Sequence, residues 1–174
     1  MPATEKPAFR LFLLRHARAA WAQPGGNDFD RPLDDEGYAE AEAIAEEMAD
    51  QGYRPELVLS STAVRCRETA EPLRRTLGEE LDLNYVDSLY SGPTSSYAEI
   101  AFAPRVSASV MLVGHNPMVE EFFHRILGTS IAETAAPFGY PTAGLAVLDF
   151  DSRPTDDRFE GARLSCFITP RTAS

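Results

Sequence analysis

Two apolar segments of this 174-residue chain end on side chains that can bind or accept a phosphoryl group. Residues 11–14 are followed directly by Arg15 and His16. Residues 110–113 are followed by a glycine and then by His115. Arginine binds two phosphate oxygens at once through its planar fork, and a neutral imidazole can attack phosphorus. The pattern therefore predicts a phosphate site in which His16 is the nucleophile.

A third apolar segment, residues 56–60, leads to another arginine. The Ser-Thr pair at 61–62 offers an N-cap to the following helix, which places Arg65 in the first turn of that helix. A phosphoryl group in transfer spreads negative charge over three oxygens, which fixed positive groups stabilise. We expect Arg15, Arg65 and His115 to face those oxygens.

Hydrophobic patterning predicts an α/β fold that can bring these segments to one edge of a sheet. The strands are predicted over residues 9–14, 56–60, 81–86, 110–114, 144–150 and 162–168. The helices are predicted from Asp34 to Gly52, from Ser61 to Leu77, from Ser96 onward and from Asn116 to Gly128. The last two strands are expected to form an antiparallel pair, and strand 81–86 is expected near an edge of the sheet. Ligands of open α/β sheets bind outside the carboxyl ends of the strands, so residues that end neighbouring strands can face one substrate.

Local signals predict how two of these helices begin. Ser96 and Glu99 have the spacing of a capping box, which makes Glu99 a structural residue. Asn116 and Pro117 are typical of a helix start with proline at the first helical position, and the free amides of that turn are expected near His115. The polar face of the first helix carries glutamates that we expect to be solvated: Glu40, Glu42, Glu46 and Glu47.

Composition limits the classes of protein to consider. Hydrophobic residues make up 44% and charged residues 25% of the chain, as in ordinary globular proteins. We expect one domain over residues 1–174, with an ordered core over about 8–170. The formal net charge of −11 argues against nucleic-acid binding and against attachment to an anionic membrane, since both need a basic face.

The cysteines and the N-terminal segment favour a cytoplasmic protein. Cys66 and Cys166 have no spacing typical of zinc ligands and no disulfide framework. Residues 1–6 lack the charged start and apolar stretch of a signal peptide, and no apolar run is long enough to span a membrane. We therefore expect a reducing location and no membrane segment.

Taken together, the motifs make this chain resemble the histidine phosphatase superfamily, and within it the SixA branch. The Arg-His-Gly motif of the superfamily is matched by Arg15-His16-Ala17. The other matching segments are Asp30-Arg31-Pro32-Leu33 with Glu36-Gly37, Ser60-Ser61-Thr62-Ala63 with Arg65 and Thr69, Val113-Gly114-His115-Asn116-Pro117, and Pro141-Thr142-Ala143-Gly144. Alanine in place of the motif's glycine, and the little room for a cap between Arg65 and His115, resemble SixA rather than the phosphoglycerate mutases.

The resemblance implies a fold, a mechanism and a set of site residues. The fold is a single-domain three-layer α/β/α sandwich around a mainly parallel sheet with an antiparallel C-terminal strand. His16 becomes transiently phosphorylated, Arg15 and Arg65 hold phosphate oxygens, and His115 completes the catalytic pocket. Asn116 joins the substrate-binding residues. Neither a metal nor an organic cofactor is needed.

One feature of the superfamily has no secure counterpart in the sequence. Many members carry an acidic residue between the second arginine and the second histidine, and it protonates the leaving oxygen. Asp87 and Glu99 are the candidates, and for both a structural role is the better interpretation. A phosphohistidine leaves through nitrogen, which is more readily protonated than an alkoxide, so a missing acid favours a phosphoamidate or another activated substrate.

Several functions remain open from the sequence. The favoured one is a protein phosphohistidine phosphatase whose partner is a histidine-containing phosphotransfer domain. The alternatives are a phosphatase for sugar or nucleotide phosphates with a selective loop at 91–93, a mutase, and a phosphate-binding module without turnover. Trp21 and Tyr90 can flank the entrance, although packing is the commoner role of such residues. Asp30 and Arg31 are expected to anchor their loop as a pair and to take no part in catalysis.

Overall fold

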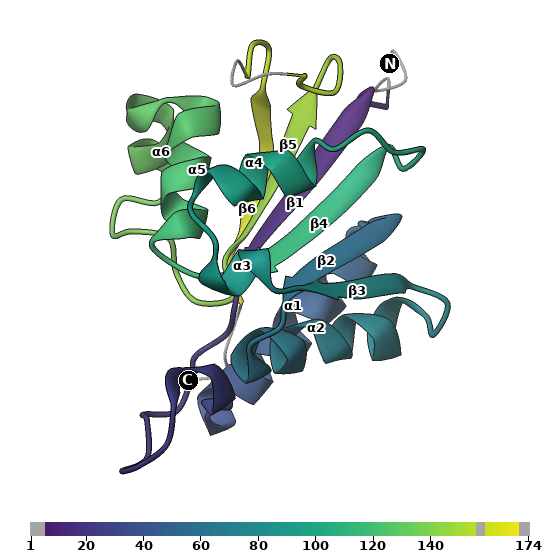
Figure 1. Ribbon diagram of the computed structural model, residues 1–174. Helices are drawn as coiled ribbons and strands as arrows, with labels where there is room; N and C mark the ends of the chain where they lie inside the picture. Colours follow the sequence, from purple (N-terminus) through teal and green to yellow (C-terminus); the bar gives the residue numbers. More distant parts are fainter. Residues whose placement is uncertain (1–5, 156–158, 171–174) are drawn as a thin grey trace.

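The computed structural model describes residues 6–155 and 159–170, so the ends of the expected 1–174 domain lie outside the described residues. Helices cover both faces of a six-stranded sheet with the order β3-β2-β4-β1-β5-β6 (Figure 1). The strands are β1 Phe9–Arg15, β2 Leu57–Ser61, β3 Asp82–Val86, β4 Ser109–Gly114, β5 Leu145–Phe150 and β6 Arg163–Ile168. The helices are η1 Asp28–Asp30, α1 Asp35–Asp50, α2 Val64–Leu77, α3 Ser88–Ser91, α4 Ser95–Ala101, α5 Met118–Leu127 and α6 Thr129–Ala135.

The pairing of the strands confirms the predicted α/β/α sandwich. Strands β3, β2, β4 and β1 are mutually parallel, with β3 at one edge. Strand β5 runs antiparallel to both of its neighbours, β1 and β6. Helices α1 and α2 lie on one face of the sheet and α4, α5 and α6 on the other (Figure 1). The expected order of strands and helices is therefore found in the molecule.

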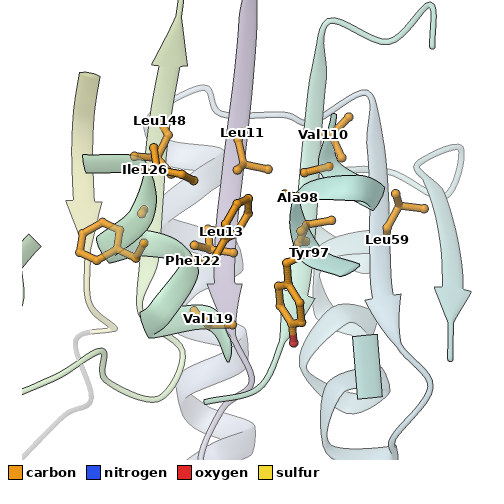
Figure 2. Packing of buried hydrophobic residues seen from close by; sticks show 14 of the residues in the cluster. Leu11, Leu13, Leu59, Tyr97, Ala98, Val110, Val119, Phe122, Ile126 and Leu148 are labelled. Atoms are coloured by element: carbon orange, nitrogen blue, oxygen red, sulfur yellow. The ribbon is translucent and has the colours of Figure 1, made fainter. Parts of the chain in front are cut away.

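Strand β1 is buried on both faces because it lies in the middle of the sheet. Its side chains alternate between the two layers, as the pleat of a strand requires. Leu11 and Leu13 pack with Phe122 of α5 on one face (Figure 2). Phe12 and Leu14 belong to the cluster on the opposite face, which includes residues of α1 and α2. An unbroken apolar run is what such a two-sided strand needs, and it ends where the polar residues begin.

Helix α1 forms for the reasons seen in the sequence. The Asp34 side chain caps it by accepting from the amide of Gly37 at 2.8 Å. Ile44 and Met48 are fully buried against the sheet, at the expected helical spacing. Gly37 is required because any β-carbon there would collide with the main chain of Arg18. This contact holds the first turn of α1 against the segment that follows β1.

The predicted caps of α2 and α4 are wrong. Ala63 is the N-cap of α2, because Ser61 still belongs to β2 and its hydroxyl accepts from the Ala63 amide at 3.2 Å. Helix α4 starts one residue before Ser96, so Ser96 and Glu99 form no capping box. Its N-cap is Thr94, whose hydroxyl donates to Glu121 of α5 at 2.6 Å instead of bonding to its own helix. The predicted capping hydroxyl of α2 thus remains in β2, and the cap of α4 lies two residues before the predicted Ser96.

No helix among residues 6–155 and 159–170 combines the length and the apolar character needed to cross a membrane.

Replacing Gly114 with alanine is expected to destabilise the protein by about 1–3 kcal/mol, the usual cost of overpacking. Gly114 ends β4, and a β-carbon there would collide with the ring and hydroxyl of buried Tyr97. Urea unfolding of Gly114→Ala and of the surface control Glu46→Ala, at an exposed position of α1, measures the effect. The control is expected to lie within about 0.5 kcal/mol of wild type. Equal stability of the two variants would show that the contact with Tyr97 is not tight.

Candidate active site

The carboxyl ends of β1 and β4 bring two histidines together. The strands are parallel neighbours, and Arg15 at the end of β1 lies opposite Gly114 at the end of β4. The amide of His16 donates to the Gly114 carbonyl at 3.0 Å, which carries the pairing one residue further. The rings of His16 and His115 consequently lie with their centroids 5.3 Å apart. The sheet itself therefore sets the distance between the two imidazoles.

His16 is held as a neutral imidazole, and one of its two nitrogens is free to act as a nucleophile. Its Nδ1 lies 2.7 Å from the Ala17 carbonyl, an acceptor that requires a proton on Nδ1. The other nitrogen, Nε2, then carries a lone pair. Burial, together with the nearby charges of Arg65 and Arg15, lowers the pKa of His16 to about 4. The lone pair is thus present throughout the neutral pH range.

His115 is also held uncharged. Its Nε2 lies 2.8 Å from the Ser61 hydroxyl, which accepts from the Ala63 amide and can donate its own proton to that nitrogen. With the Ser61 hydroxyl as donor, the proton of the neutral ring lies on Nδ1, a buried atom without a partner among the described residues. Burial, and then the neighbouring His16 and Arg65, lower the pKa of His115 to about 3. His115 can therefore donate a hydrogen bond without carrying a charge.

Two arginines lie near this histidine pair. Arg15 donates through Nη1 to the Tyr140 carbonyl at 2.8 Å, and burial lowers its pKa. Arg65 is 5% exposed and uses both terminal nitrogens on Asp28. The Nε atoms of both arginines are buried and have no hydrogen-bond partner among residues 6–155 and 159–170. Unpaired buried donors are rare in proteins, and these two belong to residues that the sequence predicts to bind phosphate.

These side chains line a pocket of about 340 Å³ that is partly open to solvent. Its lining residues are Arg15, His16, Arg18, Ala19, Trp21, Arg31, Arg65, His115, Asn116 and Thr142. The structure thus brings together all five predicted site residues. Trp21 at this pocket is 88% exposed, which departs from the packed role expected of it. Among the residues that the structure describes, the lining holds arginines and histidines but no carboxylate.

Backbone contacts fix the segment that carries His16. The Ala143 amide donates to the carbonyls of Arg15 and His16, and Ala143 adopts a φ of 54°, in the left-handed region. Such a conformation costs free energy for a residue other than glycine and persists only where its surroundings enforce it. Thr69 accepts from the Ala17 amide at 2.9 Å and donates to the Arg65 carbonyl at 2.7 Å. The two segments that carry His16 and Arg65 are therefore locked together.

The expectation for the amides after Asn116 is only partly met. Pro117 is the N-cap of α5 rather than its first residue. The Val119 amide donates to the His115 carbonyl, and the Glu120 amide donates to the Asn116 side chain. These two amides are satisfied within the chain and are not free to bind an anion. Asn116 reaches the pocket through its side chain, which also donates to the Tyr140 carbonyl at 3.3 Å.

Glu40 is wrongly predicted to be a solvated surface residue. Its carboxylate accepts from the Thr142 hydroxyl at 3.0 Å and from the Arg18 amide at 2.8 Å. Burial is the main reason why the pKa of Glu40 is raised. The carboxylate thereby joins the segment after β1 to the segment before β5. The pattern of acidic residues on α1 does not distinguish Glu40 from its exposed neighbour Glu42.

Asp28 is a functional residue that the sequence pattern does not single out. It lies in the polar loop after β1 and pairs with Arg65 and with Arg31, so Arg31 anchors its loop through Asp28 and not through Asp30. Tyr90 also donates to the Asp28 carboxylate at 3.1 Å. No local signal separates Asp28 from Asp30, because the distinguishing contact lies 37 residues away in sequence.

The two acids proposed as proton donors lie outside the pocket lining. Asp87 is exposed and precedes α3, and Glu99 is exposed on α4 beside a different cavity. Among the described residues, no group of three or more His, Cys, Asp or Glu side chains is placed to hold a metal ion. The lining thus offers a nucleophile and hydrogen-bond donors to phosphoryl oxygens, which are the groups that phosphoryl transfer requires.

Comparison with known proteins gives consistent matches. A model of the histidine phosphatase superfamily (branch 1) matches residues 11–89. A solved structure from Agrobacterium tumefaciens, named as a phosphohistidine phosphatase SixA, is 44% identical and has a TM-score of 0.84, covering 93% of this chain and 98% of that one. A second structure with the SixA name, from Nakamurella multipartitia, is 27% identical with a TM-score of 0.74, covering 96% of this chain and all of that one. An uncharacterised chloroplastic protein of Arabidopsis thaliana is 34% identical over 133 residues, which are 70% of this chain and 61% of that longer protein.

Acidification is expected to destabilise the folded protein through the two buried histidines. Both have pKa values lowered in the folded state, so between pH 6.5 and about 4 the unfolded chain takes up more protons. Each histidine then lowers the free energy of unfolding by up to about 1.4 kcal/mol for each pH unit of acidification. Urea unfolding from pH 7.5 to 4.5 is expected to show a shallower dependence for His16→Asn and for His115→Asn than for wild type. Parallel curves for all three proteins would contradict the neutral, buried state of these rings.

Proposed function

The chain belongs to the histidine phosphatase superfamily, in its SixA-type branch, and we propose that its substrate is a phosphohistidine carried on a protein. Phosphatase activity follows from the family. The observation that supports the proposed mechanism is the state of His16, whose Nδ1 is engaged by the Ala17 carbonyl while Nε2 remains available. A nucleophile needs an accessible lone pair, and the pKa of about 4 keeps it unprotonated at neutral pH.

The reaction proceeds in two steps at phosphorus. In the first step, Nε2 of His16 forms a bond to phosphorus while the bond from phosphorus to the substrate nitrogen breaks, and that nitrogen takes a proton from solvent. In the second step, water attacks phosphorus, the bond to Nε2 breaks, and the water releases a proton to solvent. Arg15 and Arg65 stabilise the charge on the oxygens in both steps, and His115 donates a further hydrogen bond from Nδ1.

No carboxylate lines the pocket within the described part of the chain, and this favours a nitrogen leaving group. An alkoxide leaving group needs a proton donor in the transition state, which is the usual task of a carboxylic acid. Asp28 is the carboxylate that pairs with Arg65, and its pKa is lowered despite some burial, because Arg65 and Tyr90 bond to its charged form. An ionised carboxylate cannot protonate a leaving group. The imidazole that leaves from a phosphohistidine accepts a proton readily from water. Its departure therefore does not need a carboxylic acid in the pocket.

The openness of the pocket favours a substrate on the surface of another protein. The pocket holds about 340 Å³ and is partly open, and exposed Trp21 lies at its rim. Exposed aromatic side chains are enriched at protein interfaces. We propose that the partner is a histidine-containing phosphotransfer domain, which presents its phosphohistidine on a folded surface.

Replacing the nucleophile is expected to abolish turnover. His16→Ala removes the only atom that carries the phosphoryl group in this mechanism, so we expect kcat to fall at least about a thousandfold. Phosphate release from a phosphohistidine protein measures the effect. His124→Ala is the matched control, because His124 lies on α5 and lines a different cavity. Activity of His16→Ala equal to that of the control would rule out the mechanism.

Arg65→Ala is expected to weaken catalysis without abolishing it. A charge-assisted hydrogen bond contributes about 1.5–3 kcal/mol, so kcat/KM is expected to fall by roughly 10- to 150-fold. Phosphate release from a phosphohistidine protein by Arg65→Ala and by wild type measures this effect.

The preferred substrate is tested by comparing a phosphohistidine protein with an aryl phosphate and with sugar phosphates at equal concentration. The highest kcat/KM is expected for the phosphohistidine protein. A preference for a small phosphomonoester would instead identify a metabolite phosphatase and overturn the proposed substrate.

A further inference from the structure

Arg65 is engaged by an acidic residue before any phosphate binds. Its Nη2 donates to the Asp28 carboxylate at 2.9 Å, and its Nη1 donates to the Asp28 carbonyl at 2.8 Å. The Arg65 side chain is 6% exposed and the Asp28 side chain 52%. A buried guanidinium thus meets a carboxylate on a solvent-facing loop. The fork that would hold two phosphate oxygens is already occupied at both terminal nitrogens.

The position of Asp28 is set by contacts from several elements. Asn27 caps the short helix η1 by accepting from the Asp30 amide at 3.0 Å. Arg31 pairs with the Asp28 carboxylate from the other end of η1 at 2.9 Å. From α3, the Tyr90 hydroxyl donates to the same carboxylate. The centroids of the Tyr90 and His115 rings lie 5.5 Å apart, so the contacts of Asp28 extend through Tyr90 to the histidine pair.

We propose that Asp28 lowers the affinity of the site for phosphate, so that free phosphate leaves after hydrolysis. Asp28 supplies the countercharge that buried Arg65 needs while the site is empty. When an oxyanion binds, the same carboxylate becomes a nearby like charge. The repulsion is strongest for small, highly charged anions, of which the product is one.

The pocket contains two arginines that can each donate a hydrogen bond to phosphate. Arg15 and Arg65 both line the pocket, and each has an unpaired Nε that can donate to an oxygen. Arg65 then binds phosphate through one nitrogen while its other two nitrogens remain on Asp28. Charge pairs near a protein surface interact with an effective dielectric constant between that of protein and that of water. Removing the negative charge of Asp28 beside Arg65 is expected to tighten phosphate binding on the order of three- to tenfold.

Asp28→Asn removes the charge while keeping an oxygen to accept from Arg65. The main-chain bond from Nη1 to residue 28 is unaffected by the change. The matched control is Asp30→Asn, which removes one negative charge from the same short helix. The Asp30 side chain makes no hydrogen bond or ion pair within the part of the chain that the structure describes. Comparison of the two variants separates a specific effect at Arg65 from a general change in net charge.

The experiment measures the dissociation constant of inorganic phosphate by calorimetry and its inhibition constant against phosphohistidine hydrolysis. We expect Asp28→Asn to lower both constants on the order of three- to tenfold at low salt, with the difference shrinking toward 1 M salt as screening increases. Asp30→Asn is expected to stay within about twofold of wild type at every salt concentration. Phosphate binding to Asp28→Asn that is unchanged, or weaker than in wild type, would overturn the role of Asp28.

Arg65→Ala distinguishes a failure of this inference from a failure of the proposed function, on which it rests. If Arg65→Ala binds phosphate more weakly and Asp28→Asn matches wild type, the phosphate site stands and the role of Asp28 is wrong. If wild type neither binds phosphate nor hydrolyses a phosphohistidine, the proposed function fails and this inference fails with it. If Arg65→Ala binds phosphate as wild type does, Arg65 is not part of the site and the role of Asp28 is again excluded.

Discussion

The site depends on keeping two imidazoles uncharged while they lie buried beside two guanidinium groups. A protonated ring at either position would face like charges in a poorly solvated setting, so burial and repulsion act in the same direction and lower both pKa values. The hydrogen bonds then decide which nitrogen carries the proton. The Ala17 carbonyl holds it on Nδ1 of His16, and the Ser61 hydroxyl favours Nδ1 of His115. One electrostatic constraint thus provides both a nucleophile and a neutral donor.

The rest of the fold keeps the cationic groups in place against their mutual repulsion. The chain carries a net charge of −11, and individual carboxylates lie beside particular arginines. Asp28 pairs with Arg65, and the charges of Glu120 and Glu40 partly offset the effect of burial on Arg15. Glu120 also accepts from the Tyr140 amide, next to the carbonyl that Arg15 binds. Carboxylates at the margin of the pocket therefore offset the charge of its arginines, and none of the described lining residues is itself acidic.

The sequence predicts the strands and the grouping of the site residues well because both depend on local patterns. A buried central strand must be apolar on both faces, and β1 and β4 carry that requirement in consecutive residues. Side chains whose roles come from distant partners are predicted poorly. Ser61 belongs to a strand and contacts His115 instead of capping α2, and Glu40 accepts a hydrogen bond from Thr142. Asp28 is recognised only when the loop after β1 folds onto α2.

Direct identification of the phosphorylated atom tests the central claim, that the free Nε2 of His16 is the nucleophile. The enzyme is mixed with a phosphohistidine protein, turnover is stopped within milliseconds under alkaline conditions that preserve phosphoramidates, and the phosphorylated residue is located by mass spectrometry and by ³¹P NMR. The predicted result is one phosphoryl group on Nε2 of His16, formed and lost at rates compatible with turnover. Phosphate on another residue, or on Nδ1 of His16, would contradict the account.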